Sequence, residues 1–155
     1  MSTKMSACDG CSRRTLLKGL GLAALAPLVL DALAGCQPGS SAPTANTTTC
    51  AGGLCIDLGD SANAALATAG GALLVDTASD TILVVRVSDT SVIALSAVCT
   101  HSGCIVDYNA SAQRIDCACH GSQFTETGTV IRGPARRALT QYTATLSGTT
   151  ITIAA

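Results

Sequence analysis

From Leu54 onward, the chain shows short runs in which hydrophobic and polar residues alternate. Clear examples are Leu54–Leu58, Thr81–Val87 and Ser91–Val98. Alternation with period two, together with many Thr, Val and Ile residues, is typical of half-buried antiparallel strands. Shorter candidates are Ala72–Val75, Ile105–Tyr108, Gln113–Asp116, Gly128–Ile131, Ala138–Leu146 and Thr149–Ile153. The pattern predicts an all-β, antiparallel domain, in which Ser61–Thr68 is a short and irregular segment of helical composition.

Residues 1–35 follow a different pattern, with a basic start, an apolar middle and small residues at the end. This layout is typical of a secretory leader. The run Ser12–Lys18, which contains Arg13 and Arg14, resembles the twin-arginine signal of proteins that fold before they cross the membrane. We therefore expect a helical leader and a protein on the outer, periplasmic face of the cell membrane. The alternative is a buried helix or a chance Arg-Arg pair.

The end of this segment admits two kinds of membrane anchor. Leu33-Ala34-Gly35-Cys36 resembles the lipobox of bacterial lipoproteins, in which the cysteine is acylated and becomes the new N-terminus. The competing interpretation is an uncleaved transmembrane helix. The apolar run Gly19–Cys36 is short against the roughly 20 residues that a span needs, and Asp31 within it costs about 2.5–3.5 kcal/mol. We therefore favour lipidation of Cys36, and both interpretations tether the protein to a membrane.

Residues 36–49 are rich in Pro, Ser, Thr, Ala, Asn and Gly and carry no charge. This composition predicts a flexible tether. The folded domain is then expected to comprise residues 50–155. It contains a single Phe, Phe124, so its core is thin and would benefit from a cross-link or a bound cluster.

The charge distribution limits the kinds of molecule that the protein can bind. Every lysine lies in the first eighteen residues, and from Cys36 onward five arginines face eight acidic residues. A nucleic-acid surface needs clustered basic charge and stacking aromatic residues, which this composition does not supply. The sequence therefore predicts no nucleic-acid partner.

Two short motifs carry the strongest chemical signal. Cys99-Thr100-His101-Ser102-Gly103-Cys104 and Cys117-Ala118-Cys119-His120-Gly121-Ser122 each contain a Cys and a His that could bind a metal. Thiolates and imidazoles in equal number suit zinc or an iron–sulfur cluster. Zinc fingers usually pair Cys with Cys and His with His along the chain, whereas here each motif mixes the two. Mixed motifs suit a two-metal centre with thiolates on one iron and imidazoles on the other. A structural zinc site is the alternative.

The two motifs resemble those of the Rieske iron–sulfur family, Cys-Thr-His-x-Gly-Cys and Cys-x-Cys-His-Gly-Ser, with Gly133-Pro134-Ala135 similar to the loop that caps the cluster. The resemblance implies a small β-sandwich with a cluster-binding subdomain of two loops and a [2Fe-2S] cofactor. It implies that Cys99 and Cys117 bind one iron and that His101 and His120 bind the other. It also implies a disulfide between Cys104 and Cys119, and a hydrogen bond from Ser122 to a cluster sulfur.

Three positions depart from the pattern of the respiratory members. Phe124 stands where high-potential members have Tyr, which predicts a somewhat lower potential within the range of about −150 to +300 mV. Ser102 replaces a large apolar residue that docks on cytochrome b, and Arg136 replaces a proline of the capping loop. Arg132, Arg136 and Arg137 form either ordinary solvated surface or a basic rim that steers an acidic redox partner.

The two motifs assign no role to Cys50 and Cys55, which could form either a local disulfide or a redox-active pair. For the whole chain, the resemblance implies one-electron transfer on the outer face of the membrane, with quinol as a candidate donor and a cytochrome as a candidate acceptor. The alternative is the small electron-transfer subunit of a periplasmic oxidoreductase of the arsenite-oxidase kind, so the sequence leaves open whether the chain is part of an enzyme.

Overall fold

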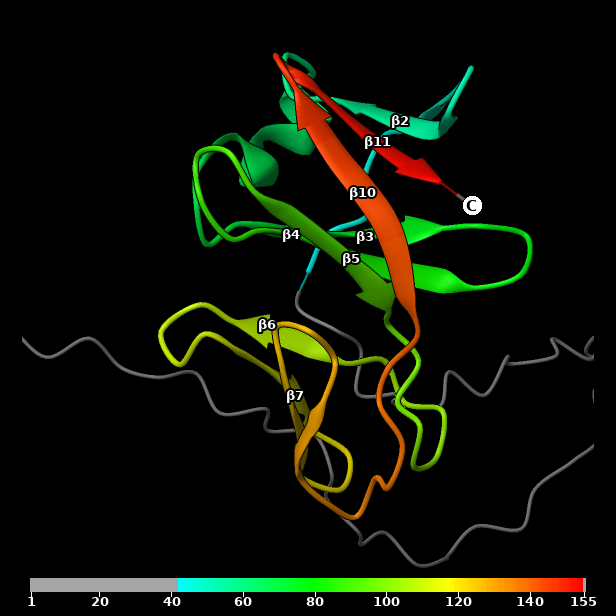
Figure 1. Ribbon diagram of the computed structural model, residues 1–155, viewed down its shortest axis with the longest axis vertical. Helices are drawn as coiled ribbons and strands as arrows, with labels where there is room; N and C mark the ends of the chain where they lie inside the picture. Colours follow the sequence, from blue (N-terminus) through cyan, green and yellow to red (C-terminus); the bar gives the residue numbers. More distant parts are fainter. Residues whose placement is uncertain (1–41, 155) are drawn as a thin grey trace, which may run out of the picture. The chain divides into compact units, whose positions relative to one another are not determined.

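The computed structural model describes residues 42–154. They form eleven strands and one 3₁₀ helix, η1, and Figure 1 shows how these are arranged. The all-β prediction is confirmed, and every strand pair is antiparallel. The elements are β1 Thr48–Cys50, β2 Gly53–Asp57, η1 Ser61–Ala67, β3 Ala72–Asp76, β4 Thr81–Arg86, β5 Val92–Ser96, β6 Asp107–Asn109, β7 Arg114–Cys117, β8 Ser122–Thr125, β9 Val130–Arg132, β10 Gln141–Ser147 and β11 Thr150–Ala154.

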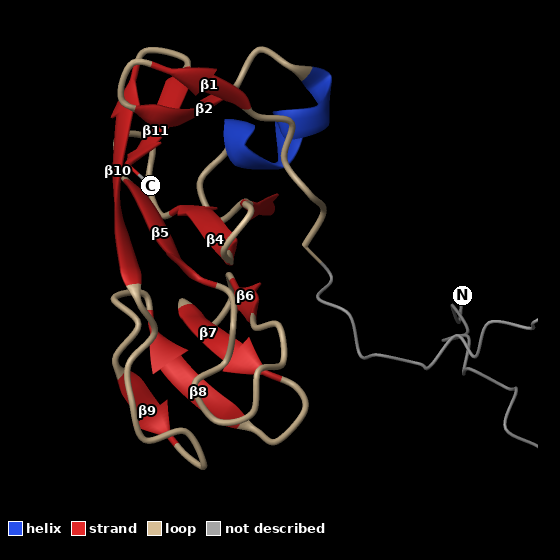
Figure 2. Cartoon of the chain, turned by 90° about the vertical axis from the view of Figure 1, so that its right-hand side faces the viewer, coloured by secondary structure: helices blue, strands red, loops and turns tan. Residues whose placement is uncertain are grey.

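Seven strands form one large sheet in the order β1-β2-β11-β10-β5-β4-β3. The sheet folds over at β10, because the first two residues of this strand pair with β5 and the remaining five pair with β11. The two halves of the sheet then share a core. Ile56 and Ile151 come from one half, and Val75 and Val84 from the other, and all four are fully buried in the same cluster. This curled sheet is the predicted sandwich (Figure 2).

Four shorter strands form a second sheet in the order β6-β7-β8-β9. It lies below the large sheet in Figures 1 and 2. Its buried residues Ile115 and Phe124, and Val106 directly before β6, belong to a second hydrophobic cluster, together with Leu83 and Leu95 of the large sheet. The small sheet therefore shares its core with the large sheet.

The nine strands that the alternating pattern predicts are present, with ends that shift by a few residues. Two strands were not predicted. β1 lies in the expected tether, and β8 lies within and just after the second Cys/His motif. The first motif was expected to follow directly on a strand, but β5 ends at Ser96, and Val98 makes only an isolated bridge with Ile105.

The predicted tether over residues 36–49 differs from the structure in its second half. Thr44 forms a bridge with Leu74, and Thr48 and Thr49 pair with β2. The buried side chain of Asn63, in η1, accepts a hydrogen bond from Asn46 N at 2.8 Å and donates one to Asn46 O at 2.9 Å. The folded domain therefore begins before Cys50, because these residues satisfy their backbone groups on η1, β2 and β3.

The expected leader over residues 1–35 and the lipidation of Cys36 lie outside the described residues. Within residues 42–154, no helix has the length and hydropathy needed to span a membrane.

Candidate metal centre

The first Cys/His motif forms a tight loop between Val98 and Ile105. Cys99 N donates to Cys104 O at 2.8 Å, and Gly103 N donates to Cys99 O at 2.9 Å. Gly103 has a φ of 74°, a conformation that residues with a Cβ rarely adopt. A Cβ at Gly103 would meet no other atom within 4 Å, so the backbone angle rather than a lack of space requires glycine here.

The second motif forms a matching loop between β7 and β8. Cys117 and Ser122 are opposite each other in the register of this strand pair. Gly121 N donates to Cys117 O at 2.9 Å, and Gly121 has a φ of 75°. Each loop thus bends back so that a glycine four residues later bonds the carbonyl of its first cysteine. The histidines occupy different positions within this frame, because His101 is two residues after its cysteine and His120 is three.

A disulfide joins the two loops. It links Cys104 to Cys119 with a Cα–Cα distance of 6.5 Å. This is the pair that the Rieske resemblance implies. A second disulfide, Cys50–Cys55, closes the β1–β2 hairpin, so these two cysteines form a local bridge.

The two imidazoles lie side by side at the surface. The ring centroids of His101 and His120 are 4.7 Å apart, with the rings edge to face at 78°. Both residues are exposed. The two loops therefore present a pair of nitrogen donors toward solvent, although nineteen positions separate the two histidines in the sequence.

The two remaining thiols lie side by side on the inner side of the loops. Cys99 and Cys117 are each 2% exposed and belong to the hydrophobic cluster that contains Phe124. They are the free cysteines of the described chain. Burial raises the pKa of the Cys117 thiol, and the neighbouring Cys99 raises it further, while the N–H groups of Cys119 and His120 act in the opposite direction. A buried thiol beside a second thiol, such as that of Cys117, resists ionisation unless a cation replaces its proton.

The separation of the buried thiols from the exposed imidazoles tests which metal group fits the site. Within residues 42–154, no group of three or more Cys, His, Asp or Glu side chains is arranged to hold a single ion. The donors instead form two pairs, buried sulfur and exposed nitrogen. A Rieske [2Fe-2S] centre needs two cysteines on one iron and two histidines on the other. The donor set therefore fits such a cluster.

A third loop, residues 133–137, closes over both motifs. Ala135 N donates to the fully buried Ser122 Oγ at 3.0 Å, and Thr100 Oγ1 donates to Arg137 O at 2.6 Å. Each Cys/His motif is thus hydrogen-bonded to this capping loop, which contains the cis peptide Gly133–Pro134. A hydroxyl that accepts one hydrogen bond retains its own proton for donation, so Ser122 can still donate to a further acceptor.

Sequence reasoning did not identify Thr100 as a contact to the capping loop. Its position inside the first motif is the only signal that could have indicated it. Two of the three departures from the respiratory pattern lie in different environments, because Phe124 is fully buried in the same hydrophobic cluster as the cysteines whereas Ser102 is exposed beside His101.

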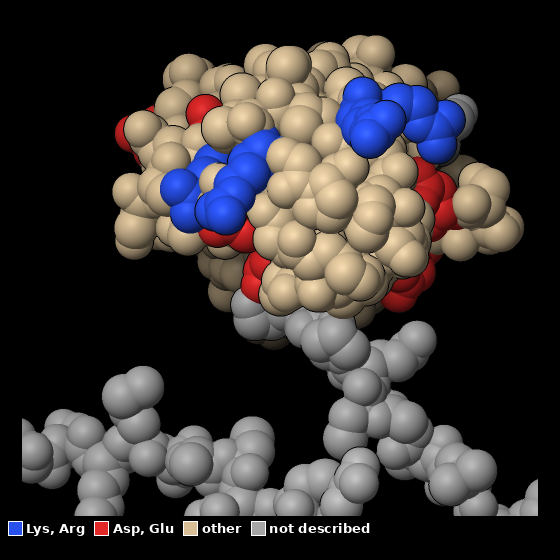
Figure 3. All heavy atoms as spheres, turned by 90° about the horizontal axis from the view of Figure 1, so that it is seen from below, with Lys and Arg blue, Asp and Glu red and all other residues tan. Residues whose placement is uncertain are grey.

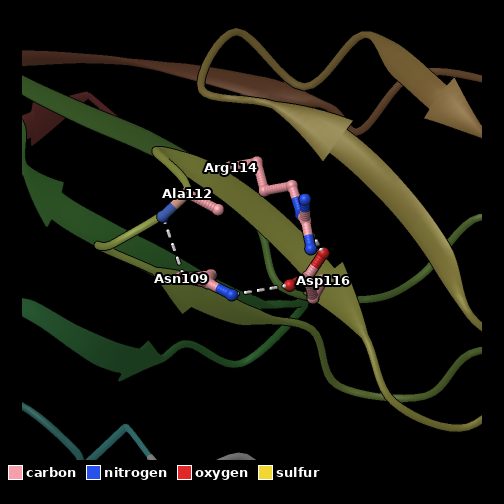
Figure 4. A network of polar contacts seen from close by, with 4 residues as sticks. All are labelled: Asn109, Ala112, Arg114 and Asp116. Atoms are coloured by element: carbon pink, nitrogen blue, oxygen red, sulfur yellow. Dashed lines mark hydrogen bonds and ion pairs between the residues drawn. The ribbon is translucent and has the colours of Figure 1, made fainter.

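A polar network supports the hairpin that leads to Cys117 (Figure 4). Arg114 Nε and Asp116 Oδ1 form an ion pair at 2.8 Å, and Asn109 Nδ2 donates to Asp116 Oδ2 at 3.1 Å. Partial burial acts to raise the pKa of Asp116, but the hydrogen bonds from Arg114 and Asn109 outweigh it and hold the pKa below its usual value. The Asn109 side chain also accepts from Ala112 N, which closes the β6–β7 turn.

Known proteins share these features. Residues 61–143, more than half of the chain, match the family described as the Rieske [2Fe-2S] domain. A segment of 54 residues is 54% identical to the cytochrome b6-f complex iron-sulfur subunit of Synechococcus sp. strain JA-3-3Ab and covers 35% of this chain and 31% of that protein. A segment of 45 residues is 53% identical to the cytochrome b6-f complex iron-sulfur subunit 1 of Nostoc sp. strain PCC 7120. It covers 29% of this chain and 25% of that protein. The chain thus spans about a third or less of these curated relatives.

Among solved structures, the fold is similar to that of the plasma membrane Rieske protein PetC3 from Synechocystis PCC 6803. The TM-score is 0.51 at 34% identity, and the similarity covers 54% of this chain and 86% of that chain. The sequence match, the fold and the segregated donor pairs agree with the resemblance that the two motifs carry. The chain therefore belongs to the family of Rieske [2Fe-2S] domains, and the cofactor is a Rieske-type [2Fe-2S] cluster.

Proposed function

We propose that this protein transfers single electrons at the outer face of the cytoplasmic membrane. The observation that supports this most strongly is the pairing of buried Cys99 and Cys117 with exposed His101 and His120 on two cross-linked loops. We assign the two cysteines to one iron and the two histidines to the other, and Ser122 as a hydrogen-bond donor to a cluster sulfur. When bound, such a cluster accepts and releases one electron at a potential of about −150 to +300 mV.

The residues around the site favour outer-sphere electron transfer over substrate chemistry. The sulfur donors are shielded from water, whereas the imidazoles face the solvent, so a partner reaches the site through His101 and His120. The disulfide and the two hydrogen bonds to the capping loop hold the loops in place. Fixed ligands are expected to move little when the charge of the centre changes, which favours fast transfer.

The relatives suggest the partners. Both curated relatives are cytochrome b6-f iron-sulfur subunits, and PetC3 is a plasma membrane protein. We therefore place a quinol as donor and a cytochrome as acceptor, with the exposed imidazole edges as the point where a quinol hydroxyl would donate. In this proposal residues 1–35 are a twin-arginine leader, Cys36 is lipidated, and the tether shortens to about residues 36–41, since the chain from Ala42 packs on the domain.

A second candidate function follows from Ser102. This residue is exposed and polar beside His101, where respiratory subunits carry an apolar residue for docking on cytochrome b. The absence of that anchor at this position favours a small electron-transfer subunit of a periplasmic oxidoreductase. The two candidates share the cluster and its ligands and differ only in the donor.

Stopped-flow mixing of the purified full-length protein tests the proposal. The reduced protein should reduce a ferric c-type cytochrome with a stoichiometry of one electron per protein, and Cys117→Ser should abolish this because it removes a cluster ligand. A protein that carries the cluster but exchanges no electron with any c-type cytochrome would overturn the proposal. Reduction of the oxidised protein by a ubiquinol or menaquinol analogue in membranes supports the quinol function, and failure of that reaction supports the oxidoreductase subunit.

A further inference from the structure

Three arginines lie on or directly before the capping loop and are called the basic patch here, with Arg136 and Arg137 on the loop and Arg132 one position before it. All three are exposed. The ion pair recorded within residues 42–154 is Arg114–Asp116, so the patch has no internal acidic partner there. Figure 3 views the molecule from the end where the capping loop lies and shows basic side chains in two separate groups on this face, with acidic side chains at its edges and directly beside one of the two groups.

The basic patch adjoins the exposed imidazoles. A hollow of about 340 Å³ is lined by His101, Thr100, Pro134, Arg136 and Arg137. A second hollow of about 500 Å³ extends from Arg137 along the first metal-binding loop. The hydrogen bond from Thr100 to Arg137 O fixes the patch against that loop. Cationic side chains therefore flank the place at which electrons enter or leave.

The rest of the domain has the opposite charge. Three of the five arginines of residues 42–154 lie in the patch, whereas all eight acidic residues lie outside it. Asp80 lines the second hollow, but its carboxylate is engaged by Tyr142 OH at 2.7 Å and by Ser96 Oγ at 3.1 Å. An approaching acidic protein is thus repelled by the net charge of the rest of the domain and attracted to the three arginines, although Asp107 and Asp116 belong to the same small sheet and Glu126 directly follows β8. Such an arrangement both accelerates and orients an encounter.

We propose that the basic patch is the docking surface for the acidic face of a soluble one-electron redox protein. This inference rests on the proposed function and adds the chemistry of the partner. An anionic membrane surface is a poorer fit, because helices and loops that lie on lipid present several apolar side chains, and Ile131 is the exposed large hydrophobic residue of the described chain. In the docked pair, one electron leaves the reduced protein and reduces a ferric haem, with no bond made or broken.

The test compares two variants of equal net charge in the cluster-loaded, full-length protein. The patch variant carries Arg132→Gln, Arg136→Gln and Arg137→Gln, and the control carries Thr49→Glu, Thr90→Glu and Ser147→Glu, at exposed positions of the large sheet and its loops. An acidic and a basic c-type cytochrome are the probes. Rates are measured by stopped flow over a series of salt concentrations, and affinity by surface plasmon resonance with both proteins oxidised, so that binding is measured without electron transfer.

We expect the patch variant to lower the rate and affinity toward the acidic cytochrome by about 10-fold or more at low salt and to remove most of the salt dependence. The control should change both by less than about 2-fold, and the basic cytochrome should not be slowed by the patch variant. Equal effects of the two variants would show that only net charge matters and would overturn the proposal. So would loss of binding to anionic phosphatidylglycerol vesicles with unchanged rates, which would assign the patch to lipid. If the unmodified protein showed no iron–sulfur spectrum at all, this would instead refute the proposed function.

Discussion

The two sheets of this domain are stabilised in different ways. The large sheet encloses a hydrophobic cluster of its own, with Ile56, Leu73 and Ile82 among its buried residues. The small sheet has strands of only three or four residues, and its buried side chains share a cluster with one face of the large sheet. A strand pair of this length has few ladder hydrogen bonds and little area to bury, so it is marginal alone.

Cross-links take the place of a separate core in the small sheet. The disulfide Cys104–Cys119, the hydrogen bonds of Ser122 and Thr100 to the capping loop, and the Tyr108–Glu126 hydrogen bond all join segments distant in the sequence. Burial therefore sets the fold of the large sheet, whereas specific bonds set the positions of the two Cys/His loops. Loss of one bond should therefore disturb the site before it disturbs the fold.

The largest expected effect comes from Phe124, the side chain by which the small sheet joins the shared cluster. Phe124→Ala should lower the free energy of unfolding by about 3–5 kcal/mol, because it leaves a cavity at a fully buried position. Denaturant titration measures this loss, and Phe124→Leu, which fills more of the cavity, should lose less. A loss below about 1 kcal/mol for Phe124→Ala would show that the small sheet does not depend on the shared core.

The two disulfides offer a matched comparison of the two regions. Replacing Cys104 and Cys119 with Ser should cost about 3 kcal/mol from loop entropy, and replacing Cys50 and Cys55 about 2 kcal/mol, since the closed loops differ in length. Only the first change should also raise hydrogen exchange in the β7–β8 loop and the capping loop. Equal exchange in both variants would contradict the view that the Cys104–Cys119 disulfide positions the two Cys/His loops.

A substitution of Asn63 tests how much the contact between η1 and the segment around Asn46 stabilises the large sheet. Asn63→Ala removes two donated bonds and one accepted bond from a residue that is 1% exposed, so it should cost about 1–3 kcal/mol. Asn46→Ala removes an exposed side-chain bond to Asp60 and should cost less. Thermal unfolding measures both, while the spectrum of the metal centre should not change. A changed spectrum in Asn63→Ala would show that the metal centre depends on this part of the large sheet, which would contradict the view that the two regions are stabilised separately.

The smallest effect concerns the tyrosines, one in each region. Burial, with a hydrogen bond to Glu126, raises the pKa of Tyr108 to about 12. Because the folded pKa lies above the usual value of 10.0, the hydrogen bond stabilises the fold fully below pH 10 and this contribution is lost as the pH rises through about 12. In a Tyr142→Phe variant, ultraviolet absorbance should show Tyr108 ionising near pH 12. Ionisation near pH 10 would contradict the cross-link.

Much of the fold follows from the sequence, since alternating hydrophobic residues such as those of β4 and β5 predict strands directly. β8 was missed because Ser122 and Gln123 are polar and because its start coincides with the metal-binding motif. β1 was missed because Thr48 and Thr49 follow a Pro/Ser/Thr-rich stretch and pair only through β2. Composition of a segment does not reveal that its backbone finds partners elsewhere in the domain.

At the site, the spacing of the motifs indicated which side chains are candidates, but not how they are held. The hydrogen bond from Thr100 to Arg137 joins residues 37 positions apart, and that from Ala135 to Ser122 joins residues 13 apart. The segregation of exposed imidazoles from buried thiols also depends on the tertiary packing of Cys99 and Cys117 against Phe124. No local pattern encodes these long-range contacts.

The central claim is that Cys99 and Cys117 hold one iron and that His101 and His120 hold the other. Pulsed EPR of the reduced protein, combined with iron and sulfide analysis, tests it most directly. We predict two irons and two sulfides per chain and nitrogen hyperfine couplings from two histidines. Bound zinc without iron, or an iron–sulfur signal that lacks nitrogen couplings, would contradict the assignment.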